Sequence, residues 1–265
     1  MVNTYTIDEL DKLKKAEYPY IEKQQIGEYE CSIYIDNYRS EDWFGYLGWL
    51  RKTKDPERAR NLTSNCHILR YKRLIKEGDT VFDCGANEGY LTLIFAKLVG
   101  ERGRVYAFEP VLKNIEVMKK TLELNNINNV TIIHSVVGNQ SGVPVLFGGE
   151  IVHTKKGKDT YYVNSVKLDD FIDLKPNFIK VDVEGYELPV VEGSLEILKL
   201  NPIWEIEMHL SHTVGIHMKK SYGFDPDNIF KIFKNLNYSV KNGDREVVFG
   251  EEPQGCIYCR KNEEK

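Results

Sequence analysis

The chain is 265 residues long, 42% of them hydrophobic and 29% charged, which suits one large globular domain or a domain with an appendage. No apolar run approaches the roughly 20 residues that cross a bilayer, the first eleven residues contain no apolar signal-peptide core, and the odd, scattered set of five cysteines fits a reducing compartment. We therefore expect a cytoplasmic protein without a membrane span, and the net charge of −4 argues against bulk binding of nucleic acid.

Residues 1–76 are predicted to form a mostly helical N-terminal extension. The capping-box spacing from Thr6 to Glu9 predicts one short helix. A proline at position 56 predicts the start of a second helix, which runs to about residue 76. Between them, residues 28–36 alternate in part, which favours a strand or an extended segment.

Two other features of the extension each have two interpretations. The aromatic residues of 42–50 either pack on the main domain or cover a substrate pocket. Arginines and lysines outnumber acids nine to two in 51–76, which fits either a solvated helix face or a patch for an anionic substrate or RNA.

From residue 77 to residue 265, strand-like and helix-like segments alternate, which predicts a main domain with a parallel sheet between two layers of helices. Its seven strands are predicted at 80–83, 104–109, 130–137, 178–182, 203–209, 238–241 and 255–260. The helices are predicted at 90–99, 112–125, 188–199 and 226–236. This pattern indicates a doubly wound, mainly parallel, seven-stranded α/β (Rossmann-like) sheet whose last strand is antiparallel, with a small antiparallel excursion in 138–168.

The turn after the first predicted strand carries Asp83, Gly85 and Gly89. Glycines let a ligand approach the backbone closely, and a helix start offers free N–H groups. The next strand ends at Glu109, an acid placed to accept hydrogen bonds from ribose hydroxyls. Because the spacing is D-x-G-x-x-x-G rather than G-x-G-x-x-G, it favours S-adenosylmethionine over a dinucleotide as the cofactor.

Asp182 ends the fourth predicted strand, and right-handed crossovers bring it to the same rim as Asp83 and Glu109. If the acceptor of a methyl group is a hydroxyl, its oxygen must be aligned with the methyl group and lose its proton. Asp182 is therefore expected to position the acceptor hydroxyl or to accept its proton. Glu184 is a further candidate for this work.

Glu205, Glu207 and His209 alternate along the fifth predicted strand, so they share one face of it. A strand buried on both sides rarely holds such residues without use, so Glu207 and His209 are expected to assist catalysis. The alternative is that they are structural and pair with Lys180 or other basic groups. The spacing of His209 and His212 lacks a supporting helical motif, and no metal site is expected.

Four stretches resemble the FkbM-type family of S-adenosylmethionine-dependent methyltransferases. They are FDCGANEGY at 82–90, FEP at 108–110, VKLDDF at 166–171 and FIKVDVEGYE at 178–187. The resemblance covers about residues 78–210. It implies a class I methyltransferase fold and O-methylation of hydroxyls on sugars or natural products.

This resemblance also implies the cofactor-binding residues. They are Asp83, Gly85, Ala86, Asn87, Gly89, Glu109 and Ser135. Gly85 and Gly89 would shape the turn beneath the methionine part of the cofactor, and Asp83 would reach its amino group. Glu109 would bind the ribose diol, and Ser135 lies where this fold usually contacts the adenine.

The sequence thus predicts an S-adenosylmethionine-dependent methyltransferase that O-methylates a hydroxyl of a small molecule, a sugar or a glycan, with nucleic acid an improbable partner. One alternative is an RNA methyltransferase that uses the basic segment 51–76, although no RNA-binding module is recognisable. A nicotinamide-dependent oxidoreductase conflicts with the glycine spacing. A non-catalytic scaffold with a cofactor fold conflicts with the intact acids and glycines of the turn.

Overall fold

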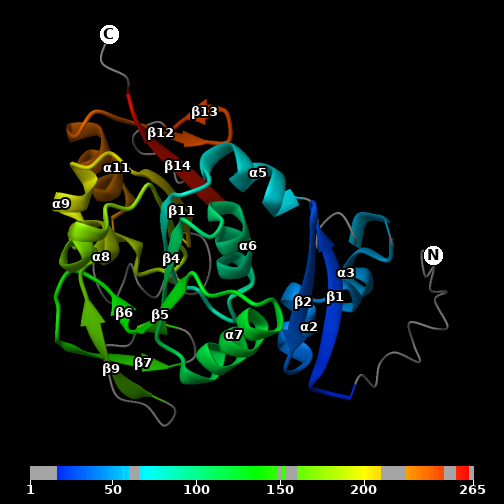
Figure 1. The fold of residues 1–265 in the computed structure, drawn as a ribbon. Coiled ribbons are helices and arrows are strands. Elements are labelled where there is room, and N and C mark those ends of the chain that lie inside the picture. Colours follow the sequence, from blue (N-terminus) through cyan, green and yellow to red (C-terminus); the bar gives the residue numbers. More distant parts are fainter. Residues whose placement is uncertain are drawn as a thin grey trace.

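The computed structural model describes residues 17–55, 57–59, 66–148, 151–152, 160–209, 225–247 and 255–262. Their centre is an eight-stranded sheet of order β13-β12-β14-β11-β10-β3-β4-β5 (Figure 1). Its strands are β3 (Thr80–Cys84), β4 (Arg104–Glu109), β5 (Val130–His134), β10 (Phe178–Val181), β11 (Ile203–Met208), β12 (Tyr238–Asn242), β13 (Arg245–Glu246) and β14 (Gly255–Lys261).

The sheet is doubly wound, as predicted. From β3 the chain proceeds outward to β4 and β5, and then returns to β10 on the other side of β3, where it continues to β11. All of these pairings are parallel, whereas β14 lies antiparallel between β11 and β12. The short eighth strand β13 was not predicted. Because strand order reverses between β3 and β10, their carboxyl ends open a crevice where this class of fold binds ligands.

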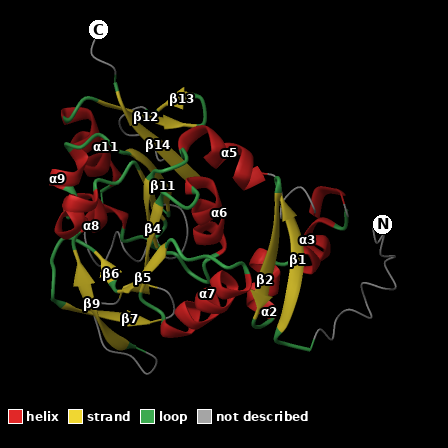
Figure 2. Cartoon of the chain, in the orientation of Figure 1, coloured by secondary structure: helices red, strands yellow, loops and turns green. Residues whose placement is uncertain are grey.

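Helices cover both faces of the sheet (Figure 2). They are α6 (Tyr90–Val99), α7 (Leu112–Leu124), α8 (Glu187–Glu192), α9 (Leu195–Leu198) and α11 (Pro226–Asn235). The single helix predicted at 188–199 is wrong, because the chain breaks between α8 and α9. A Cβ at Gly193 would lie 2.0 Å from the carbonyl oxygen of Gly138, so this position packs against another segment instead of continuing a helix.

A second, smaller sheet follows β5. Its strands, in the order β6-β9-β7-β8, are β6 (Val136–Val137), β7 (Pro144–Gly148), β8 (Ile151–Val152) and β9 (Tyr161–Val166). The 3-10 helix η2 (Leu168–Leu174) leads from it back to β10. The predicted excursion is therefore present and mostly antiparallel, although β6 pairs with β9 in parallel. The strand predicted at 130–137 is divided at Ser135 between the two sheets.

The described part of the N-terminal extension contains an antiparallel hairpin of β1 (Tyr20–Ile26) and β2 (Tyr29–Ile35). Its helices are α2 (Tyr38–Phe44), α3 (Tyr46–Thr53) and α5 (Cys66–Leu74). A mostly helical extension is thus not confirmed, because the extension also contains this hairpin, whose residues Ile33 and Ile35 are buried in the core. The helix predicted from Thr6 lies outside the described residues. Within them, no helix is long and apolar enough to span a membrane.

Candidate functional site

The turn between β3 and α6 has a backbone that only certain residues can adopt. Gly85 and Gly89 have φ values of +76° and +83°, and Asn87 has a φ of +52°. A Cβ at Gly85 would lie 1.8 Å from the carbonyl oxygen of Asp182. Gly85 therefore allows both the left-handed conformation and the close approach of the turn to the end of β10.

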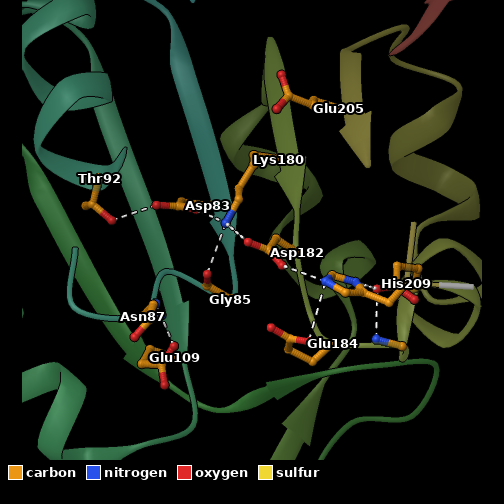
Figure 3. A network of polar contacts seen from close by, with 12 residues as sticks. Asp83, Gly85, Asn87, Thr92, Glu109, Lys180, Asp182, Glu184, Glu205 and His209 are labelled. Carbon is orange, nitrogen blue, oxygen red and sulfur yellow. Dashed lines mark hydrogen bonds and ion pairs between the residues drawn. The ribbon is translucent and has the colours of Figure 1, made fainter. Parts of the chain in front are cut away.

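Lys180 of β10 joins the turn to two carboxylates (Figure 3). Its ammonium group donates to the carbonyl oxygen of Gly85 at 3.1 Å and lies 3.5 Å from Oδ1 of Asp83 and 3.3 Å from Oδ2 of Asp182. Burial lowers the pKa of Lys180, but Asp182 and Asp83 together raise it well above its usual value. The ammonium group therefore remains charged and holds these groups together.

Lys180 was considered from sequence only as a possible partner for structural acids. Its functional placement was missed, although one signal was present: it is the single charged residue among the four buried residues of β10. A lysine on such a strand needs a carboxylate partner, and Asp182 and Asp83 supply two.

Glu109 lies at the end of β4 with only 4% of its surface exposed. Its carboxylate accepts hydrogen bonds from the backbone N–H groups of Asn87 and Val111, at 2.8 and 3.0 Å, and from the side-chain amide of Asn114 at 3.0 Å. Burial raises the pKa of Glu109, and these three hydrogen bonds oppose that effect. A carboxylate offers about four lone-pair sites, so roughly one remains for a ligand.

A cavity of about 630 Å³, which includes space open to solvent, lies over the carboxyl ends of β3, β4 and β10. Predicted site residues contribute to its wall. These are Gly85, Asn87, Glu109, Ser135, Asp182 and the further candidate Glu184. Other parts of the wall are apolar and were not predicted from sequence, among them Phe147 of the second sheet and Tyr186.

Ser135 is the clearest sign that the cavity suits a polar ligand. It is 3% exposed, and its hydroxyl has no hydrogen-bond partner among the described residues. A buried hydroxyl without a partner is costly, and a ligand in the cavity would supply one. By contrast, Asp83, Ala86 and Gly89 are not among the lining residues. Asp83 is fully buried and accepts a hydrogen bond from the Thr92 hydroxyl at 2.6 Å.

His209, directly after β11, is 7% exposed and is surrounded by carboxylates (Figure 3). Its Nδ1 lies 2.8 Å from Oε1 of Glu187, and its Nε2 lies 3.4 Å from Glu184 and 3.7 Å from Asp182. Burial lowers the pKa of His209, but the hydrogen bond with Glu187 and the three negative charges raise it to about 9. At neutral pH the imidazole is therefore a cation.

The other two acids of this strand differ in environment. Glu205 is 2% exposed, and its Oε1 accepts hydrogen bonds from Arg70 and Tyr71, which indicates a structural acid, although its Oε2 has no hydrogen-bond partner among the described residues. Glu207 is half-buried, and its pKa is raised first by burial and then by repulsion from Asp182. Neither Glu207 nor His209 is among the residues that line the cavity.

Asp182, Glu184 and His209 are also a group with the chemistry to hold a metal ion, since one ligand atom from each lies within 4.8 Å of the others. His212 lies outside the described residues. The proton on the His209 imidazole would have to leave before a metal could bind there.

Half of the described cations of the basic segment 51–76 form ion pairs. Four of its cations pair with acids outside the segment: Arg51 with Glu41, Lys52 with Asp42, Arg70 with Glu205, and Lys72 with Glu28. These pairs favour the interpretation as ordinary helix faces over a patch for RNA.

Comparison with known proteins gives consistent matches. Residues 83–240 match the model of the Methyltransferase FkbM domain. The hexuronic acid methyltransferase AglP of Haloferax volcanii is 25% identical over 208 residues, which cover 73% of this chain and 79% of that protein. A protein-L-isoaspartate O-methyltransferase of Fervidobacterium nodosum is 31% identical over 126 residues, which cover 48% of this chain and 57% of that protein.

Among solved structures, a methyltransferase FkbM from Methylobacillus flagellatus is similar, with a TM-score of 0.47 and 17% sequence identity. The match covers 85% of this chain and 62% of that chain.

Proposed function

The chain belongs to the FkbM family of methyltransferases, and from this premise we propose that it transfers the methyl group of S-adenosylmethionine to a hydroxyl oxygen of a sugar, free or within a glycan. The cofactor follows from the family. The sugar acceptor rests on the similarity to a hexuronic acid methyltransferase and on the polar character of the site beside Asp182. When bound, the cofactor supplies the electrophilic methyl group.

The residues present fit the cofactor. Glu109 retains acceptor capacity for a ribose hydroxyl, and Ser135 offers the adenine a hydroxyl that has no partner among the described residues. The apolar side chain of Phe147 also lines the cavity and could contact a heterocycle. Asp83 lies behind the wall, so we assign it to holding Lys180 and the turn.

Asp182 is the group that we assign to the acceptor. Its side chain is 28% exposed and lies at the cavity wall, with Lys180 at 3.3 Å on one side and His209 at 3.7 Å on the other. These two cations hold the carboxylate in place. An acceptor hydroxyl that donates a hydrogen bond to Asp182 would be oriented by it and would give its proton to Asp182. The bound cofactor would supply the methyl group and leave as S-adenosylhomocysteine, with its S–C bond broken.

His209 and Glu207 act through Asp182 rather than on the acceptor. A His209 imidazolium cannot accept a proton, so it serves to orient Asp182 and Glu184. Glu207 is close enough to oppose the negative charge of Asp182, and burial and this repulsion raise the pKa of Glu207. The observation that carries the proposal is that one cavity joins Glu109 at the cofactor end to Asp182 at the acceptor end.

The test is an acceptor screen with S-adenosylmethionine labelled in the methyl group, using hexoses, hexuronic acids and oligosaccharides. With the acceptor that is found, Asp182→Asn should lower turnover about 100-fold or more while changing cofactor affinity less than about tenfold. Asp173→Asn, an exposed acid away from the cavity, is the matched control and should retain turnover. Normal turnover in Asp182→Asn would refute the assigned role.

A further inference from the structure

The turn between β3 and α6, residues 85–89, is called the cofactor turn below, and it contacts a part of the chain that the family match does not include. Ser40 of α2 donates a hydrogen bond from its hydroxyl to Oε1 of Glu88 at 2.8 Å. Both side chains are buried, at 1% and 9% exposure. One turn later on α2, the ring of Phe44 stacks on the ring of Tyr90, with centroids 5.4 Å apart. The family match begins at residue 83, so α2 lies outside it.

These contacts are made at a turn whose backbone adopts an uncommon conformation. Three of the five residues of 85–89 have positive φ, and the one non-glycine among them, Asn87, is held from the cavity side by Glu109. Glu88 is the next residue, and Ser40 holds it from the opposite side. The turn is therefore fixed at two adjacent positions. Glu109 accepts a hydrogen bond from the backbone N–H of Asn87, and the side chain of Glu88 accepts one from Ser40 of the extension.

Helix α2, which carries Ser40, is held in place by its own N-cap and by contacts with α7. The side chain of Asn37 caps its first turn, and Asp36 pairs with Lys113 of α7 at 3.1 Å. The preceding strand β2 is tied to the same helix α7, where the backbone N–H of Tyr34 donates to the hydroxyl of Thr121. Figure 1 shows the hairpin alongside α7.

The core is shared as well. Ile33 and Ile35 of the hairpin belong to the same hydrophobic cluster as Leu93 of α6. The helix that begins at the cofactor turn thus packs on the extension along its buried side.

We propose that the N-terminal extension contributes to cofactor binding and that Ser40 is a positioning residue, which fixes the conformation of the cofactor turn through Glu88. This inference rests on the proposed function, in which the turn binds S-adenosylmethionine. A purely structural contact would affect the stability of the fold without affecting cofactor affinity. Loss of a positioning contact changes the affinity of the folded protein, because it displaces Gly85 and Asn87, which line the cavity, relative to the ligand.

The test is a double-mutant cycle of Ser40→Ala and Glu88→Ala, with the affinity for S-adenosylhomocysteine measured by calorimetry well below each variant's Tm. We expect each single variant to bind about 5- to 20-fold more weakly than the parent, and the double variant to bind no more weakly than either single variant. Ser32→Ala is the matched control, since Ser32 is a buried serine of the same extension whose hydroxyl bonds to Lys23 instead of the turn. It should bind within twofold of the parent.

Unchanged affinity in Ser40→Ala, or losses that simply add in the double variant, would overturn the inference. A parent that fails to bind S-adenosylhomocysteine would instead refute the proposed function, and this inference with it. If the variants do not fold, hydrogen exchange on the parent protein tests the same proposal. S-adenosylhomocysteine should slow amide exchange in 37–44 as well as in 85–92, and exchange in 37–44 that the ligand leaves unchanged would contradict the proposal.

Discussion

The two ends of the cavity are built by different means. At the cofactor end, Glu109 is surrounded by neutral donors, two of them backbone N–H groups. At the acceptor end, Asp182 lies beside the cations Lys180 and His209. His209 also contacts Glu184 and the buried acid Glu187. Backbone donors do not change with pH, whereas a cluster of carboxylates and an imidazole does. The donors around Glu109 are thus fixed by the backbone and by Asn114, whereas the surroundings of Asp182 include a titratable imidazole and several carboxylates.

The strongest expected effect comes from the lysine that connects the two ends. Lys180→Met removes the cation beside Asp83, which is fully buried, and leaves that carboxylate uncompensated. Breaking a buried pair in this way costs about 3–5 kcal/mol of the free energy of unfolding. Urea denaturation measures the loss. Lys199→Met, which removes an exposed ion pair with Glu196, is the control and should cost less than about 1 kcal/mol.

The pH dependence of stability tests the acceptor end by itself. His209 has a pKa of about 9 in the folded protein, above the 6.5 of a free histidine. Its contribution is therefore complete below pH 6.5 and is lost as the pH rises through 9, with a total of about 3 kcal/mol. We expect the difference in unfolding free energy between the parent and His209→Asn to shrink over this interval. A difference that stays constant from pH 6 to pH 10 would show that His209 is not a cation in the folded state.

The cofactor end is tested by Glu109→Ala. Loss of its charge-assisted hydrogen bonds should cost about 2–3 kcal/mol of binding, or roughly 30- to 150-fold in affinity for S-adenosylhomocysteine. Part of this loss comes from the turn, because Glu109 also holds the N–H of Asn87. Glu116→Ala, an exposed acid on α7, is the control. Parent-like affinity in Glu109→Ala would exclude the ribose assignment.

The smallest expected effect is that of a chelator. Because His209 carries a proton at neutral pH, we expect EDTA to change the rate of methyl transfer by less than about twofold. Abolition of transfer by EDTA, with recovery on addition of Mg²⁺, would reassign Asp182, Glu184 and His209 as metal ligands.

The closeness of the turn and the end of β4 could be predicted from sequence because its determinants are local. Asp83, Gly85 and Gly89 belong to one turn and Glu109 ends the next strand, so spacing alone places Gly85 and Glu109 together at the cavity, while their role in cofactor binding stays a prediction. Lys180 and Phe147 could not be placed in this way. Their roles depend on the register of β10 against β3 and on the fold of the second sheet, both of which are long-range properties.

Local patterning was also misleading in places. The amphipathic run at 188–199 has a helical period, but close packing of Gly193 against Gly138 ends the helix. In the extension, the partial alternation of residues 28–36 was the correct signal for β2, while the first strand of the hairpin had no distinct pattern. The contact between Ser40 and Glu88 joins residues 48 positions apart, and no motif indicates it.

The most direct test of the account is a parallel calorimetric titration of the parent protein with S-adenosylmethionine, S-adenosylhomocysteine and NAD. We expect saturable binding of the first two at one site per chain, and binding of NAD at least 100-fold weaker, because the turn at 85–89 and Glu109 suit the methyltransferase cofactor. Tighter binding of NAD, or no binding of S-adenosylmethionine or S-adenosylhomocysteine by the folded protein, would contradict the central claim.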